Sequence, residues 1–266
     1  MTDRRGSRTE YVRDNLDRVL KEQWLAADTS GTAFLKEYRS TYDPYGRLTL
    51  LEQGSPGSTA VLVSTSTRTF DDLDRLLTID AGSTSGQNLA KLTYQYDGYG
   101  NLTSRQQKTG TGTSQMIVTT GYSGYDFLNR LTKLNQTVSG TLANWQDKSV
   151  ELTYRNDGSV SLIKRYSDAN WTNLVVQTSF GQDGAGRLIS QTHSRLVSGS
   201  SVDVVTYAYK YFADGKLLSE VSSVPSLNFT NVTDTFGYDA AGQLTSAAKA
   251  AGAELYNYDA TGKTSY

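Results

Sequence analysis

The stretch Tyr94-Gln95-Tyr96-Asp97-Gly98-Tyr99-Gly100-Asn101-Leu102 places two short strand-like runs on either side of a four-residue turn. Asp97 and Gly100 hold the first and fourth positions of that turn. Asp is favoured at the first position of a type I turn, and a fourth residue in the left-handed region forms the bulge that often follows it. The stretch therefore predicts a β-hairpin tip with Gly100 at positive φ.

The same turn recurs along the chain at intervals of 20 to 29 residues, most of them 28 or 29. Its fourth residue is usually Gly and otherwise Asp or Asn, the residues that best tolerate positive φ. Propeller blades need about 40–50 residues for four strands, so the shorter period predicts hairpins, two strands to a repeat. The fourth residues are Asp17, Gly46, Asp74, Gly100, Asn129, Gly158, Gly186, Gly215, Gly242 and Gly262. The first residue is Asp14, Asp43, Asp71, Asp97, Asp126, Asp183, Asp239 or Asp259 in eight of the turns.

Residues beside the turns predict two kinds of pair across each hairpin. A basic residue such as Arg47 or Arg130 often follows the fourth position, where it would face the turn Asp. Such a pair contributes roughly 0.2–1 kcal/mol. An aromatic residue such as Tyr42 or Tyr96 precedes most turns, and we expect it opposite a leucine of the returning strand.

Three further features of the sequence predict local structure. In 156–159 and 213–216 the Asp stands next to the Gly, which predicts a tighter two-residue type I′ turn. The runs 60–63, 116–118 and 174–176 are apolar on both faces, which predicts that parts of the sheet are covered on both sides. Polar Gly- and Ser-rich segments, among them 54–58 and 198–201, are expected to be loops at the edge opposite the turns.

Composition excludes several classes of protein. The 266 residues carry a formal net charge of −1 with basic residues spread along the turns, so neither a nucleic-acid groove nor an anionic membrane surface is implied. There is no cysteine for a disulfide or a thiolate metal site. No apolar run reaches the roughly 18 residues of a membrane span. We expect residues 1–10 to be an N-terminal tail and 11–266 to be one array of about ten repeats, a piece of a longer array.

A tandem series of Tyr-x-Tyr-Asp-x-x-Gly-Arg-Leu units about 28 residues apart resembles the RHS/YD-repeat family over practically the whole chain. The resemblance implies an all-β fold in which tandem antiparallel hairpins form one continuous coiled sheet, part of a hollow shell. Such shells occur in bacterial polymorphic toxins, in insecticidal Tc complexes and in teneurins, and they suggest a secreted or cell-surface protein. The family's autoproteolytic Asp-Pro-x-Gly elements are not matched, because the one such stretch here, Asp43 to Gly46, is an ordinary turn. The best matches are Tyr94–Leu102, Tyr42–Leu48, Tyr125–Leu131, Phe236–Leu244 and Tyr256–Lys263.

Several residues that could form a functional site also have a purely structural explanation. The recurring Asp residues lie once per repeat along an edge, whereas acid–base catalysis needs carboxylates that converge and calcium sites need several in one loop. His193, the single histidine, has no partner that the sequence specifies. The 18 tyrosines favour packing between hairpins over a stacking platform. Trp145 and Trp171, each ending an Ala-Asn-Trp tripeptide between hairpins, are either surface contacts or seam packing.

These observations predict a structural repeat protein with no catalytic residue, cofactor or metal site. Its function would be that of a wall segment enclosing or displaying another polypeptide, such as a toxin domain. The expected partners are further repeats or a cargo chain, with self-association through open sheet edges, and the aromatic face would line the inner side of the wall. The alternative is a cell-surface module that binds carbohydrate or acts as an adhesin through exposed aromatic residues.

Overall fold

A computed structural model describes residues 7–25, 34–54, 62–83, 88–110, 115–140, 145–225, 229–249, 252–259 and 261–265. The described chain is all-β and contains no α-helix, as the alternating pattern predicts. Strands β1 to β19 belong to one antiparallel sheet, and β20 and β21 form a separate two-stranded sheet. The chain divides into two units: unit 1 is Met1–Ser123 with Gln136–Asp147, and unit 2 is Gly124–Asn135 with Lys148–Tyr266.

In unit 1 each strand pairs with its neighbours in chain order from β1 to β9. The first strand begins at Arg8, three residues ahead of the boundary that the repeats suggest. Its strands are β1 (Arg8–Arg13), β2 (Val19–Leu25), β3 (Phe34–Tyr42), β4 (Leu48–Gly54), β5 (Leu62–Phe70), β6 (Leu76–Ser83), β7 (Asn88–Tyr96) and β8 (Leu102–Thr109). β9 (Met116–Tyr125) and β10 (Leu131–Gly140) contribute residues to both units.

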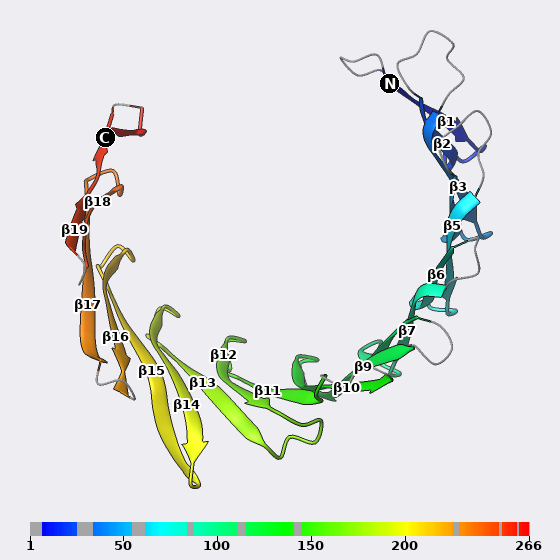
Figure 1. Ribbon diagram of the computed structural model, residues 1–266. Helices are drawn as coiled ribbons and strands as arrows, with labels where there is room; N and C mark the ends of the chain where they lie inside the picture. The colour runs from blue at the N-terminus through cyan, green and yellow to red at the C-terminus, as the bar shows by residue number, and fades with distance from the viewer. Residues whose placement is uncertain are drawn as a thin grey trace. The chain divides into compact units, whose positions relative to one another are not determined.

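In unit 2 the strands β11 to β18 again lie side by side in chain order (Figure 1), with β19 added beyond β18. Its strands are β11 (Lys148–Tyr154), β12 (Val160–Tyr166), β13 (Leu174–Gln182), β14 (Leu188–Val197), β15 (Ser200–Tyr211), β16 (Leu217–Val224), β17 (Phe229–Tyr238), β18 (Leu244–Lys249), β19 (Gly252–Leu255), β20 (Asn257–Tyr258) and β21 (Thr264–Ser265).

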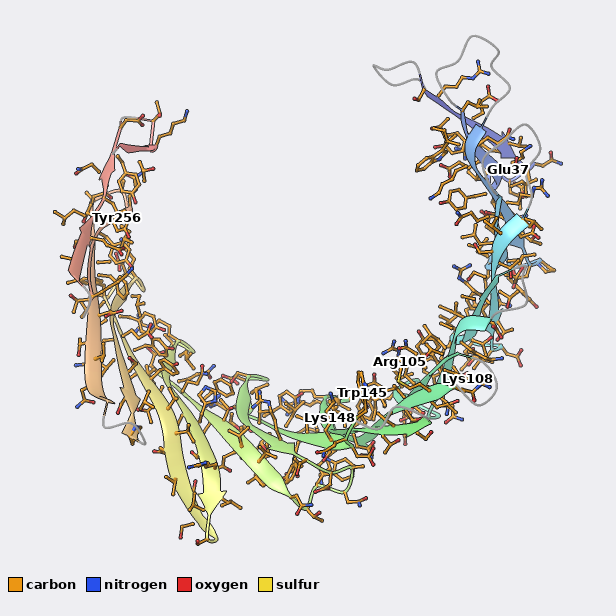
Figure 2. The ribbon with its side chains drawn as sticks, in the orientation of Figure 1. Glu37, Arg105, Lys108, Trp145, Lys148 and Tyr256 are labelled. Carbon is orange, nitrogen blue, oxygen red and sulfur yellow. The ribbon has the colours of Figure 1, made fainter. Side chains whose placement is uncertain are left out.

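The sheet is a single layer without a conventional hydrophobic core. Side chains project from both sides of the ribbon (Figure 2), and Leu25 and Ala247 are the buried apolar side chains of the described chain. The expectation that apolar runs are covered on both faces is wrong for two of the three runs, since Val63 and Val175 are exposed, whereas residues 116–118 are half-buried. No second layer packs on these strands within the described chain, so apolar side chains are shielded only by their neighbours in the sheet. Residues 60 and 61 of the first run lie outside the described residues.

Eight of the hairpins that close with a four-residue turn carry a bulge just beyond that turn. Tyr42 faces Leu48 as expected, but Thr41 faces Leu50, so Thr49 has no residue opposite. The extra residue lets the aromatic–leucine pair beside the turn form while the strands regain register further out. The extra residues are Leu20, Thr49, Leu77, Thr103, Ser161, Ile189, Leu218 and Thr245.

The connection between β14 and β15 differs from the loop expected over 198–201. Ser198 and Gly199 both have positive φ, 52° and 82°, and Val197 pairs with Ser200 directly across them. Positive φ at both central residues is the mark of a two-residue type I′ turn. The chain therefore reverses tightly here, and Ser200 and Ser201 already belong to β15. In the other expected loop, Gly54 belongs to β4 and 55–58 lie outside the described residues.

Candidate functional site

The ten turns share one backbone geometry. In the turn Asp97–Gly100, the Gly100 amide donates to the Asp97 carbonyl at 3.2 Å, and the Asp97 amide donates to the Asn101 carbonyl at 2.9 Å. Gly100 has φ +91°, and Asn129 adopts φ +57° in its place in another turn. All ten fourth residues have positive φ, as the spacing predicts: Asp17, Gly46, Asp74, Gly100, Asn129, Gly158, Gly186, Gly215, Gly242 and Gly262.

The turns at 156–159 and 213–216 follow this geometry too, so the predicted type I′ turns are wrong. Gly158 donates to the carbonyl of Arg155 at 3.1 Å, and Gly215 to that of Phe212 at 3.0 Å. Asp157 and Asp214 are thus third residues of four-residue turns. A two-residue turn would shift the register of the returning strand, which is fixed by its pairing with the next hairpin.

The turn Asp organises its loop through both carboxylate oxygens. In the Asp43 turn, Oδ1 accepts the amides of Tyr45 at 3.0 Å and Arg47 at 2.9 Å, while Oδ2 accepts the Arg47 Nε at 2.6 Å. Partial desolvation opposes ionisation of Asp43, but the amide and guanidinium bonds from Arg47 outweigh it and lower the pKa of the carboxyl. The expected Asp–Arg pairs are confirmed, and they recur at Asp14, Asp71, Asp126 and Asp183.

The same arginines also reach forward to the next hairpin. The Arg75 guanidinium carbon lies 4.8 Å from the centroid of the Tyr96 ring, and its Nη1 donates to the Asp97 carbonyl at 3.1 Å. In return, the Tyr96 hydroxyl donates to the Leu76 carbonyl at 3.0 Å. We call this set of contacts the clamp. It joins consecutive hairpins by a stacked cation and two hydrogen bonds that run in opposite directions along the chain.

Clamps with an arginine stacked on an aromatic ring occur in both units. Within unit 1, Arg47 stacks on Phe70, which lacks a hydroxyl, and its Nη1 bonds Asp74 at 2.6 Å. Lys216 stands over Tyr238 at 5.8 Å in unit 2. The remaining stacked pairs are Arg18–Tyr42 in unit 1 and Arg130–Tyr154 and Arg187–Tyr211 in unit 2, and each of these tyrosines donates its hydroxyl to a carbonyl of the preceding hairpin.

One junction in unit 2 replaces both partners of the clamp together. Ser159 stands where the arginine would be and Gln182 where the tyrosine would be, and the Ser159 hydroxyl donates to Gln182 Oε1 at 2.9 Å. Arg155, in the position of the turn Asp, crosses to the carbonyl of Phe180 on the next hairpin. A polar pair and a displaced guanidinium thus bridge the same two hairpins.

The single histidine lies in a hydrogen-bonded row across three strands. His193 Nδ1 is 3.0 Å from the Thr178 hydroxyl and Nε2 is 2.7 Å from the Gln191 amide nitrogen. Thr178 is buried and also accepts a bond from Arg165 at 3.0 Å. His193 therefore hydrogen-bonds to a Thr and a Gln, and the neighbouring Ser194 is bonded instead to Asp203 at 2.8 Å.

The two tryptophans have different surroundings. Trp171 is half-buried, with its indole N–H donating to the Val150 carbonyl at 3.2 Å and Lys133 Nζ at 5.6 Å from its ring. It belongs to the seam between strands, one of the two roles expected for it. Trp145 lies just ahead of β11 and is 54% exposed (Figure 2), so it remains available for contact. Ala143 and Asn144 beside it lie outside the described residues.

Asp168 organises the loop that presents Trp171. Its carboxylate accepts the amides of Asn170 at 2.7 Å, Thr172 at 3.2 Å and Asn173 at 2.5 Å. Partial desolvation opposes ionisation, but these amide bonds outweigh it and lower the pKa of Asp168 to about 2. The loop therefore holds its form around an ionised carboxylate.

The most buried carboxylate among the described residues is Glu37 on β3, labelled in Figure 2. It accepts bonds from Gln23 at 2.6 Å and Arg39 at 2.7 Å, and Lys21 approaches at 3.5 Å. Desolvation opposes its ionisation, but these partners lower its pKa. Glu37 is thus a satisfied structural anion among strands β2 and β3.

Within the part of the chain that the structure describes, no group of three or more His, Cys, Asp or Glu side chains is placed to hold a metal ion. No described helix is long and apolar enough to span a bilayer.

The forward reach of the arginines to the next hairpin was not predicted from the sequence. The sequence does hold a signal for this contact, because the residue after one turn and the residue before the next turn change together. Where the basic residue becomes Ser159, the aromatic residue becomes Gln182.

Comparison with known proteins finds no matching family model and no matching curated protein. Among solved structures, the chain is similar to TcdB2-TccC3-TEV, at 12% identity over 99% of this chain with a TM-score of 0.35, and to TcdB2-TccC3, at 14% identity over 95% with a TM-score of 0.36. This chain spans 17% and 18% of those two chains, less than a fifth of their length. A porin-like protein from Bacteroides uniformis matches at 11% identity over 92% of this chain and 91% of its own, with a TM-score of 0.25. The fold assignment rests on the strands and turns of this chain itself.

Proposed function

We propose that this chain is a non-enzymatic wall segment of an RHS-type shell, a scaffold that encloses or displays another polypeptide. The observation that carries the proposal is the clamp, which repeats from hairpin to hairpin in each unit and uses the charged residues of the turns for assembly of the sheet. Charged groups that are committed to neighbouring hairpins hold a surface together. They do not converge on a cleft, as acid–base chemistry requires.

The single-layer architecture supports the same role. Apolar and aromatic side chains remain half-exposed on strands that nothing covers within the described chain, as at Val175 and Trp24. A polypeptide held against such a surface would gain apolar contacts that the sheet alone cannot supply. The partners we propose are further repeats of the parent protein, a cargo chain, and other copies at open strand edges.

The test is protease protection in the natural polypeptide that carries this chain. We expect the segment next to the repeats to resist a protease while the sheet is intact, and to become cleavable in a variant with R75Q, R130Q and R187Q, which removes three clamps. Equal cleavage of that segment in both proteins, with the wild-type sheet folded by circular dichroism, would contradict an enclosing role. A hydrolytic activity abolished by H193A would contradict the non-enzymatic one.

The second candidate is an adhesive or carbohydrate-binding module. The specific observation in its favour is the exposure of aromatic side chains away from the sheet, namely Trp145 and the turn residues Tyr45, Tyr99 and Phe127. A glycan array probed with the wild-type chain separates the two functions, because saturable binding lost in W145A would favour the module over the wall.

A further inference from the structure

The third residue of each turn points away from the hairpin, and in unit 1 it is always large and apolar. Leu16, Tyr45, Leu73 and Tyr99 are 73%, 81%, 71% and 89% exposed. We call these four residues the tip row. Large apolar side chains at such exposure are normally scattered singly, whereas here they recur at one position on successive hairpins.

The turn itself does not require an apolar third residue. In unit 2 the turn Asp126–Asn129 keeps an apolar third residue, Leu128, which is 55% exposed. The five later turns hold Asp157, Ala185, Asp214, Ala241 and Thr261 at that position, and they keep the same backbone hydrogen bonds. The Ala185 amide donates to Asp183 Oδ1 at 2.9 Å just as the Tyr99 amide donates to Asp97 Oδ1 at 2.9 Å. The same turn therefore forms with or without an apolar third residue. The need to form the turn does not explain why unit 1 has a large apolar residue at this position in every turn.

The tip row is held at a regular spacing. Consecutive turns stand two strands apart, which is about 9.5 Å in a sheet. Arg47 ties the second turn to the third through Asp74 at 2.6 Å, and Arg75 ties the third to the fourth through the Asp97 carbonyl at 3.1 Å. The apolar side chains therefore form a fixed ladder along one edge of unit 1.

The accessible charge beside the tip row is negative. The four turns and the residue following each hold seven aspartates and three arginines, with Arg13 just ahead of the first turn. Arg18, Arg47 and Arg75 have side chains only 22–28% exposed and are paired with turn aspartates. Asp17 and Asp74 each meet an arginine, yet their side chains are 87% and 72% exposed.

From this spacing and charge we propose that the tip row binds a cationic amphipathic helix with an apolar residue at every seventh position. Seven residues of helix rise about 10.5 Å, close to the separation of two turns. The mismatch of about 1 Å per step stays within the reach of a side chain over four tips. Lys or Arg beside the apolar stripe would meet Asp17 and Asp74, while an anionic membrane would be repelled. The proposal is independent of the enclosing role, because it concerns the turn edge.

The test uses a labelled four-heptad peptide with a leucine stripe flanked by lysines, and a second peptide with glutamates in place of the lysines. Fluorescence anisotropy should show binding of the lysine peptide by the wild-type chain, weakening as salt is added. The variant L16T/Y45T/L73T/Y99T should bind it at least about tenfold more weakly. The control V12T/L20T/L35T/V63T changes four exposed aliphatic residues of unit 1 outside the turns, and should bind within about twofold of wild type.

Circular dichroism first establishes that both variants are folded. Equal binding by wild type and tip-row variant, equal binding of the two peptides, or no binding of the lysine peptide would each overturn the proposal. Vesicles with anionic lipid that sediment with the wild type and not with the tip-row variant would overturn it in favour of a membrane surface. Self-association that the tip-row variant abolishes would overturn it in favour of a second copy of this chain.

Discussion

Disruption of the clamp between Arg75 and Tyr96 should reveal an interaction energy that belongs to the junction between hairpins. The Arg75 side chain is 27% exposed, and its guanidinium carbon lies 4.8 Å from the Tyr96 ring centroid. Cation–π contacts contribute about 0.5–1 kcal/mol at exposed sites and about 2 kcal/mol when desolvated. For this partly shielded pair we expect a coupling of about 1 kcal/mol.

A double-mutant cycle of R75Q with Y96L isolates that coupling. A second cycle of R75Q with Y96F tests its origin, because the Tyr96 hydroxyl bonds Leu76 and does not bond Arg75. Y96F alone should destabilise the hairpin by about 1 kcal/mol, the usual contribution of one hydrogen bond. Its coupling to R75Q should nevertheless be close to zero.

Native-state hydrogen exchange of amides in β7 and β8 is the suitable assay, because repeat arrays need not unfold as one unit and exchange reports local free energies. The control cycle is R18Q with Y96L, since Arg18 stacks on Tyr42. A coupling in R75Q/Y96L no larger than the about 0.3 kcal/mol expected for independent sites would refute the clamp.

Three further outcomes follow from the turns and their carboxylates. G100V should destabilise its hairpin by roughly 1–3 kcal/mol and G100N by less, because a Cβ at Gly100 meets no atom within 4 Å and the penalty is conformational; equal thermal melts would contradict this. The folded-state pKa values of Asp71 and Asp126 lie below their ordinary 3.8. Their contribution to stability is therefore complete above that pH and is lost as the pH falls through the folded-state values. The pKa of Asp168 is about 2, so the loss from this group continues to about that pH. Thermal melts should therefore change little through these groups between about pH 7 and 5 and fall steeply below about pH 3.8, and an earlier fall would assign acid sensitivity to other groups. S159R should lower the melting temperature by placing a guanidinium beside Arg155, whereas R155D/S159R/Q182Y, which restores the common pattern, should recover most of the loss; no recovery would show that the clamp does not transfer between junctions.

The local geometry could be predicted from the sequence because it depends on residues only a few positions apart. Asp43 and Gly46 specify their own turn through φ preferences and carboxylate bonds, and Arg47 is then close enough to pair with Asp43. The Tyr42–Leu48 pair follows from the same turn. Each of these contacts lies within a single hairpin, where spacing along the chain determines spacing in the structure.

Contacts between hairpins could not be derived from that spacing. Arg75 and Tyr96 lie 21 residues apart, and nothing in the turn says that the guanidinium reaches over the next ring. The turn at Asp157–Gly158 was mispredicted for a related reason, since the strand register set by both neighbours overrides the local Asp-Gly preference. For Trp171, the sequence left open a choice that a half-buried indole bonded to Val150 decides.

The scarcity of buried apolar residues also determines how stability should respond to temperature. The chain exposes 16935 Å², about 1.5 times the roughly 11,400 Å² expected for a globular protein of 29.1 kDa. Unfolding then hydrates less new apolar surface per residue, so the heat-capacity increment should fall below the usual 12–15 cal/mol/K per residue. A small increment flattens the dependence of the unfolding free energy on temperature. Such a sheet would hold nearly constant stability across a wide range of temperatures and would resist denaturation in the cold.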